Sequence, residues 1–122
     1  MRTLLLAGFA MLALAPAAAL AQQAKQDFTL INRTGYEISH VHVAPTKSDE
    51  WGDDVLGQDT LGYGDSVQIQ FSRRERICRW DLRVTYSVDD TSAFWRSIDL
   101  CSVERITIRY NKNTDTSSAT FD

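Results

Sequence analysis

The chain has 122 residues, a formal net charge of −3 at pH 7 and only two cysteines. A chain of this length makes one domain with a modest core, and its acidic balance argues against general nucleic-acid binding, which draws on a basic surface. It carries no P-loop, no G-x-S-x-G and no H-E-x-x-H pattern, which excludes the enzyme classes that depend on those signatures.

Residues 1–21 have the pattern of a secretory signal peptide. Arg2 precedes an apolar run, and the segment ends on the small residues 19-ALA-21, the order of an n-region, an h-region and an A-x-A cleavage site. Polar Gln22 follows at once, whereas a membrane span needs roughly 20 apolar residues and stop-transfer flanks. We therefore predict a mature chain that starts at Gln22, has no membrane span and is secreted, to the periplasm.

Apolar and polar residues alternate along the remaining chain, and no stretch shows a helical period. The alternation predicts strands near residues 28–32, 36–43, 67–71, 78–86, 94–100 and 106–110. A change of parity after Ile38 predicts a β-bulge near residues 39–40, and the polar segment 111–122 is predicted to be a flexible tail. The sequence therefore predicts an all-β fold, a single antiparallel β-sandwich or small barrel of about six strands over residues 22–110.

The inward positions of these strands define the predicted core. Its members are Phe28, Leu30, Ile38, Val67, Ile69, Phe71, Trp80, Leu82, Val84, Ile98, Ile106 and Ile108. A two-residue turn at residues 89–90 would place Trp80 opposite a polar residue, which alternation forbids on a buried face. We therefore predict a hairpin register shifted by one residue, with Trp80 opposite Leu100 and Leu82 opposite Ile98.

Cys78 and Cys101 are the two cysteines. In an oxidising compartment two cysteines most simply form one disulfide, and no further cysteine or histidine lies near them to suggest a metal site. The bridge would close a loop of roughly 20 residues, worth about 3 kcal/mol on the chain-entropy model. In the shifted register it would run diagonally or from just beyond the strand ends.

The connection 46–60 is rich in acidic residues, with Asp49, Glu50, Asp53, Asp54 and Asp59. Calcium takes 6–8 oxygen ligands, many of them loop carboxylates, although the spacing matches no EF-hand pattern. The candidate calcium ligands are Asp49, Asp53, Asp54 and Asp59. No other cofactor is expected.

A second interpretation of this loop is favoured over calcium. Trp51 and Leu56 would anchor the loop as a plug at one end of the sandwich, and the acids would stay in water. Gly52 and Gly57 would let the backbone turn there.

Two further groups of residues are candidate ligand sites. His40 and His42 share one face of a strand, which suits a transition metal if a carboxylate completes the site; exposed histidines are the alternative. Arg73, Arg74 and Arg76 are a candidate patch for a carboxylate, phosphate or sulfated sugar, although interleaved acids favour cross-strand charge pairs on a solvated sheet face, at Arg79, Asp81 and Arg83.

Four blocks occur in the order 30-LINRTGYEI-38, 51-WGDDVLG-57, 79-RWDLRV-84 and 99-DLC-101. They resemble a family of small secreted, uncharacterised bacterial proteins with the pattern N-x-T-G, W-G-x-D-x-L-G, C-x-W-D-L-R, D-G and D-L-C. The resemblance spans about residues 28 to 108, and Asp90-Thr91 stands where the family tends to have Asp-Gly. Its members often carry the label argininosuccinate lyase, the name of a much longer helical cytoplasmic enzyme whose chemistry these residues do not supply.

Together these observations predict a secreted, non-catalytic binding or envelope-associated module with an unknown protein or envelope ligand. The first alternative is a calcium-stabilised binding module that uses the loop 49–59. An enzyme, as the lyase label implies, is the least favoured class.

Overall fold

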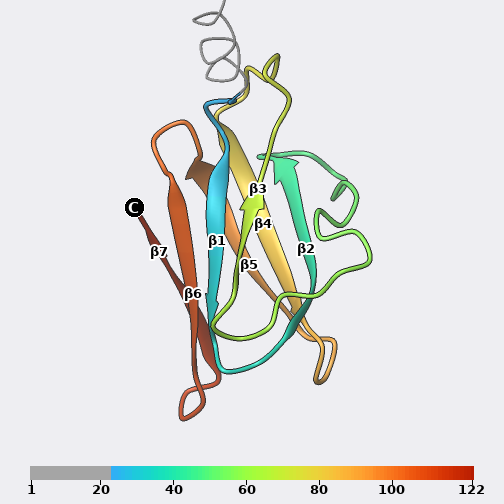
Figure 1. Ribbon diagram of the computed structural model, residues 1–122, viewed down its shortest axis with the longest axis vertical. Helices are drawn as coiled ribbons and strands as arrows, with labels where there is room; N and C mark the ends of the chain where they lie inside the picture. The colour runs from blue at the N-terminus through green and yellow to red at the C-terminus, as the bar shows by residue number, and fades with distance from the viewer. Residues whose placement is uncertain (1–22) are drawn as a thin grey trace, which may run out of the picture.

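The computed structural model describes residues 23–122 as two β-sheets packed face to face (Figure 1). The strands are β1 (Phe28–Arg33), β2 (Ile38–Pro45), β3 (Ser66–Ile69), β4 (Arg79–Tyr86), β5 (Ser92–Asp99), β6 (Arg105–Asn111) and β7 (Thr116–Phe121). One sheet has the order β3-β1-β6-β7 and the other β2-β4-β5. The predicted all-β sandwich is therefore confirmed, with two open sheets in place of a barrel. The predicted signal peptide, residues 1–21, lies outside the described residues.

Most strand pairs are antiparallel, as predicted, with one exception. β1 pairs parallel with β6, so that Leu30 lies opposite Ile106. A parallel pair needs a long crossover, and here the whole β2–β5 segment supplies it. The β-bulge predicted near residues 39–40 is confirmed, because the register of β2 against β4 shifts between Ile38 and His40. Between residues 23 and 122 no helix has the length and apolar character needed to cross a membrane.

The predicted core residues fill the space between the sheets. All of them are buried except Val67 and Phe71, which pack against the core while partly exposed. Further buried apolar residues, outside the predicted core list, are Val41, Ala44, Leu56, Leu61, Tyr86 and Leu100. Leu56 and Leu61 come from the connection between β2 and β3, which means that this acidic segment contributes to the core.

The prediction that residues 111–122 form a flexible tail is wrong, because half of this segment is strand β7. β7 pairs antiparallel with β6 along its full length, with Ala119 opposite Ile108. Its inward positions carry Ser117 and Ala119, which are too small and too polar to produce an apolar alternation. Backbone hydrogen bonds stabilise the strand instead, and the N–H of Asp122 still donates to the start of β6 at 2.9 Å.

The predicted register of the β4–β5 hairpin is also wrong. Trp80 lies opposite Ile98 and Leu82 opposite Trp95, so β5 holds one extra residue between these pairs. Ser97 adopts a left-handed φ of 57° at this bulge, and its N–H donates to the Asp81 carboxylate at 2.8 Å. Asp81, predicted on a solvated face, is in fact buried. The bulge keeps the apolar residues facing inward without the predicted one-residue shift.

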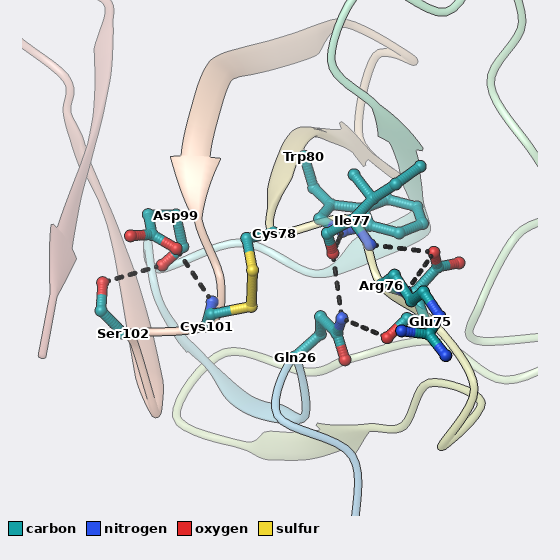
Figure 2. The surroundings of a disulfide bond; sticks show 9 residues. All are labelled: Gln26, Glu75, Arg76, Ile77, Cys78, Trp80, Asp99, Cys101 and Ser102. Atoms are coloured by element: carbon teal, nitrogen blue, oxygen red, sulfur yellow. Dashed lines mark hydrogen bonds between the residues drawn. A yellow bond between two sulfur atoms is a disulfide. The ribbon is translucent and has the colours of Figure 1, made fainter.

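The disulfide between Cys78 and Cys101 is formed, with a Cα–Cα distance of 5.2 Å. It joins the residue before β4 to a residue after β5, just beyond the strand ends, as predicted. Figure 2 shows Gln26 beside it. The Gln26 amide donates to two loop carbonyls, of Glu75 and Ile77, at 3.0 and 2.9 Å. The segment just before β1 is therefore tied to the disulfide end of the sandwich.

Candidate functional site

The acidic connection 46–60 runs along β2, which is an edge strand. The N–H of Val55 donates to Val41 O at 2.8 Å, and Ile38 and Leu61 exchange two backbone hydrogen bonds of 2.9 Å. An uncovered edge strand exposes unpaired backbone groups that favour aggregation. This connection therefore covers the edge of the three-stranded sheet.

Asp54 fixes the loop to this edge. Its Oδ1 accepts hydrogen bonds from the N–H of Val41 at 3.0 Å and of Leu56 at 2.9 Å, and its Oδ2 lies 2.8 Å from His40 Nδ1. Burial raises the pKa of Asp54, but the two backbone donors and His40 outweigh it and hold the pKa below its usual value. The ionised carboxylate is thus used inside the protein and is not left free for a ligand.

Trp51 and Leu56, the predicted anchors, occupy two different places. Leu56 is buried in the core. The Trp51 ring instead lies on the outer face of the three-stranded sheet, 5.9 Å from the Phe94 ring centroid and beneath Arg83, whose Cζ is 4.9 Å from its centroid. Trp51 therefore anchors the loop, but it packs on the sheet surface and does not plug the end of the sandwich.

The structure does not assemble the predicted calcium site. In residues 23–122, the only group of three potential metal ligands within 4.8 Å of one another is Cys78, Asp99 and Cys101, and both sulfurs there belong to the disulfide. Asp49, Asp53 and Asp59 are exposed.

Replacing Asp54 by Ala is expected to destabilise the protein by about 2 kcal/mol, because two backbone N–H groups lose their acceptor. The neighbouring Asp53→Ala is a matched control and should change stability by less than about 0.5 kcal/mol. Urea unfolding in EDTA and in calcium measures both. We expect the same loss in either buffer; a loss confined to the calcium buffer would restore the ion-site interpretation.

The two histidines lie side by side but are engaged by the same loop. Their ring centroids are 6.2 Å apart. His42 Nδ1 lies 2.9 Å from Gly52 O, and His40 Nδ1 contacts Asp54. In the described part of the chain no third ligand joins them, so they hold the loop on the sheet.

The arginine patch lies elsewhere. Arg73, Arg74 and Arg76 are all exposed on the connection between β3 and β4, at the disulfide end. Glu75 stands between them, and its carboxylate accepts a hydrogen bond from the N–H of Arg76 at 3.0 Å.

A cleft of about 570 Å³ opens between β5 and β7. These two strands are edge strands of their sheets (Figure 1). The cleft lies where the β4–β5 and β6–β7 turns end the molecule, opposite the disulfide. Five aromatic residues line it: Tyr36, Tyr86, Phe94, Trp95 and Tyr110. Polar residues of the two turns and strand starts complete it, namely Asp89, Thr91, Ser92, Asp115, Thr116 and Ser117. This volume falls in the range of pockets for small molecules.

The tyrosines of the cleft form one connected group. Tyr110 packs edge-on against Tyr36, with centroids 5.6 Å apart at 79°, and lies 6.1 Å from Tyr86 at 59°. The Tyr86 hydroxyl is 2.7 Å from Ser117 Oγ, and the Tyr110 hydroxyl donates to Asp115 at 2.7 Å. These contacts join the two sheets and fix the ring positions.

The field in the cleft is negative. The hydrogen bond to Asp115 raises the pKa of Tyr110 to about 12, and Asp89 acts in the same direction. Asp89 itself accepts from the N–H and hydroxyl of Thr91 at 3.1 and 2.7 Å, which hold its pKa below the usual value. Asp89 is therefore ionised at neutral pH, and Tyr86 and Tyr110, whose pKa values are both raised, keep their protons.

Sequence reasoning did not find this cleft. Its walls come from the β1–β2 turn, two hairpins and β7, and β7 was assigned to the tail. The residues carry only a weak signal: Tyr36, Tyr86 and Tyr110 each stand at a strand end, next to turn residues.

No protein-family model and no curated protein matches the sequence. Among solved structures, the chain is similar to an NMR structure of a protein from Eubacterium rectale, with a TM-score of 0.54 and 18% identity. The match covers 78% of this chain and 85% of that chain, and at this identity it shows the fold alone. The resemblance to the family of small secreted bacterial proteins therefore stays a prediction.

Proposed function

We propose that the protein is a secreted, periplasmic, non-catalytic binding module that holds its ligand in the cleft between β5 and β7. The observation that carries the proposal is the cleft itself. It combines several aromatic walls with a polar rim, the usual composition of a small-molecule site. Val88, which lines the cleft, is 69% exposed, so apolar surface remains available to a ligand.

The cleft is also built on rigid parts. Tyr86 is 7% exposed and belongs to the core, and Ala93 and Trp95 lie opposite buried Val84 and Leu82. A site held by packed strands keeps its shape before the ligand arrives, which lowers the entropic cost of binding. A rigid, preformed cleft is sufficient for a protein that binds its ligand without catalysing a reaction.

A mixed panel of neutral, anionic and cationic small molecules, titrated against the ¹⁵N-labelled mature chain, tests the proposal. We expect at least one class to shift the amide resonances of Ala93, Trp95 and Ser117 saturably. Ala93→Leu adds three carbons to the cleft wall and should weaken that binding at least about ten-fold. Ser118→Leu, on the outer face of β7 and outside the lining of the cleft, should leave it unchanged. A panel without any saturable shift in the cleft would overturn the binding function.

Secretion is tested separately by expressing the full chain and fractionating the cells. We expect the protein in the periplasmic fraction, with Gln22 as its first residue. An unprocessed chain in the cytoplasm would contradict this part of the proposal.

A further inference from the structure

We propose that the ligand of the cleft between β5 and β7 is an organic ammonium ion, a cation with an apolar body. This inference rests on the proposed binding function and names its ligand class. Three features carry it: the arrangement of the aromatic rings, the charge of the rim and the absence of basic residues from the lining.

The aromatic rings line a hollow and do not form a flat surface on which a ligand could stack. Tyr110 makes angles of 79° with Tyr36 and 59° with Tyr86, so the three rings face different directions. A flat sugar ring stacks best on an exposed aromatic face, whereas walls of several orientations surround a compact group. The face of an aromatic ring attracts cations, and sites for quaternary ammonium groups are commonly built of several such rings.

The rim adds two carboxylates from separate hairpins. Asp89 lies in the β4–β5 turn and Asp115 in the β6–β7 turn, and both line the same cleft. The hydrogen bonds of the folded chain use Oδ1 of each carboxylate, from Thr91 and from Tyr110 respectively. Oδ2 of each remains for a ligand. A cation between the two turns would be attracted by both charges and would relieve their mutual repulsion.

No Lys, Arg or His is among the residues that line the cleft. An anionic ligand would therefore meet two carboxylates and no opposite charge. The hydrogen bond to Asp115 raises the pKa of Tyr110 to about 12, and the charge of Asp89 acts in the same direction. A neutral ligand would gain from the rings but would leave both charges uncompensated, which makes the cation the best fit to the whole cleft.

The first test compares two compounds of the same shape that differ in charge. Choline and its neutral analogue 3,3-dimethylbutan-1-ol are titrated against the ¹⁵N-labelled mature chain at low salt. We expect choline to shift Ala93, Trp95 and Ser117 and to bind at least about ten-fold more tightly than the alcohol. Its affinity should fall as salt is raised, because the two carboxylates are screened.

The second test removes the rim charges without disturbing the turns. In Asp89→Asn with Asp115→Asn, the amide oxygen still accepts the hydrogen bonds of Thr91 and Tyr110. Asn also tolerates the left-handed φ of 50° at residue 115. Choline binding should weaken at least about ten-fold. Asp53→Asn with Asp59→Asn makes the same change in net charge on the exposed loop and should leave the affinity unchanged.

Three outcomes would overturn the ammonium inference. They are equal binding of the neutral alcohol, equal loss in the loop control, and the absence of any choline shift in the cleft. If the alcohol or another neutral compound binds there, the binding function stands and only the ligand class is wrong. If the whole panel leaves Ala93, Trp95 and Ser117 unshifted, both proposals fail together.

Discussion

Replacing Cys78 and Cys101 by serine is expected to lower the melting temperature of the protein by about 12 to 24 °C. The bridge closes a loop with a sequence separation of 23 residues, which is worth about 3 kcal/mol on the chain-entropy model. A domain of this size shifts by about 4 to 8 °C per kcal/mol. Circular dichroism melts of the mature chain measure the difference.

The control for this prediction is the reducing agent. Dithiothreitol should lower the melting temperature of the unmodified protein by the same amount and should leave the double serine variant unchanged. The bridge lies at the end of β4 opposite the cleft. The folded serine variant should therefore bind cleft ligands with unchanged affinity at 10 °C. Superimposed melts of the oxidised and reduced protein would show that the bridge adds nothing to stability.

The fold could be predicted from sequence because its signal is local. Each inward residue of β4, from Trp80 to Tyr86, stands two positions from the next, and burial follows that alternation apart from Asp81. β7 could not be predicted, because Ser117 and Ala119 fill its inward positions. The inward hydroxyl of Ser117 hydrogen-bonds to the Tyr86 hydroxyl. Tyr86 belongs to the other sheet, so this partner could not be identified from the sequence of β7.

The motifs that stand out in the sequence have structural roles. Asn32 is fully buried, and its amide donates to the carbonyls of Tyr36 and Leu61 at 2.8 and 3.0 Å. Its Oδ1 accepts from the Thr34 hydroxyl at 2.6 Å, so N-x-T-G is a turn built around one side chain. Gly35, with φ of 86°, completes it. The conspicuous polar residue of this motif therefore holds a turn in place.

The cleft, by contrast, depends on contacts between distant segments. Asp89 and Asp115 are ordinary turn residues in the sequence, and only the packing of the two sheets brings both to one hollow. The acidic loop 49–59 had the stronger local signal, with its carboxylates close together in the chain. Its backbone conformation separates them, because Asp54 turns inward to the β2 edge. The spacing of acidic residues in the sequence therefore did not predict which carboxylates lie together in the folded protein.

Asp81→Ala is expected to cost about 3 kcal/mol. Asp81 is 4% exposed, and its Oδ1 accepts from the Ser97 N–H at 2.8 Å and the Thr46 hydroxyl at 3.0 Å. Removing the carboxylate leaves both donors without their acceptor, at about 1 to 3 kcal/mol for each buried group. It also releases the bulge at Ser97, which sets the register of β5. Urea unfolding at pH 7 measures the loss.

The pH dependence has a definite sign. Burial raises the pKa of Asp81, but hydrogen bonds from Ser97, Thr46 and Arg96 outweigh it and lower the pKa below its usual value. A group with a depressed pKa in the folded state contributes stability above its unfolded pKa, about 4, and loses it as pH falls through the folded pKa. The stability difference between the unmodified protein and Asp81→Asn should therefore be largest near pH 7 and shrink below about pH 4.

A variant of Arg96 separates the two ways in which Asp81 stabilises the protein, through hydrogen bonds from Ser97 and Thr46 and through an ion pair with Arg96. Its Nη1 lies 3.0 Å from Asp81 Oδ2, but its side chain is 65% exposed, and exposed ion pairs contribute about 0 to 1 kcal/mol. Arg96→Ala should therefore cost much less than Asp81→Ala and should leave the spectrum of the hairpin intact. An equal loss in the two variants would mean that the ion pair, and not the hydrogen bonds to the bulge and to Thr46, holds β5 in register.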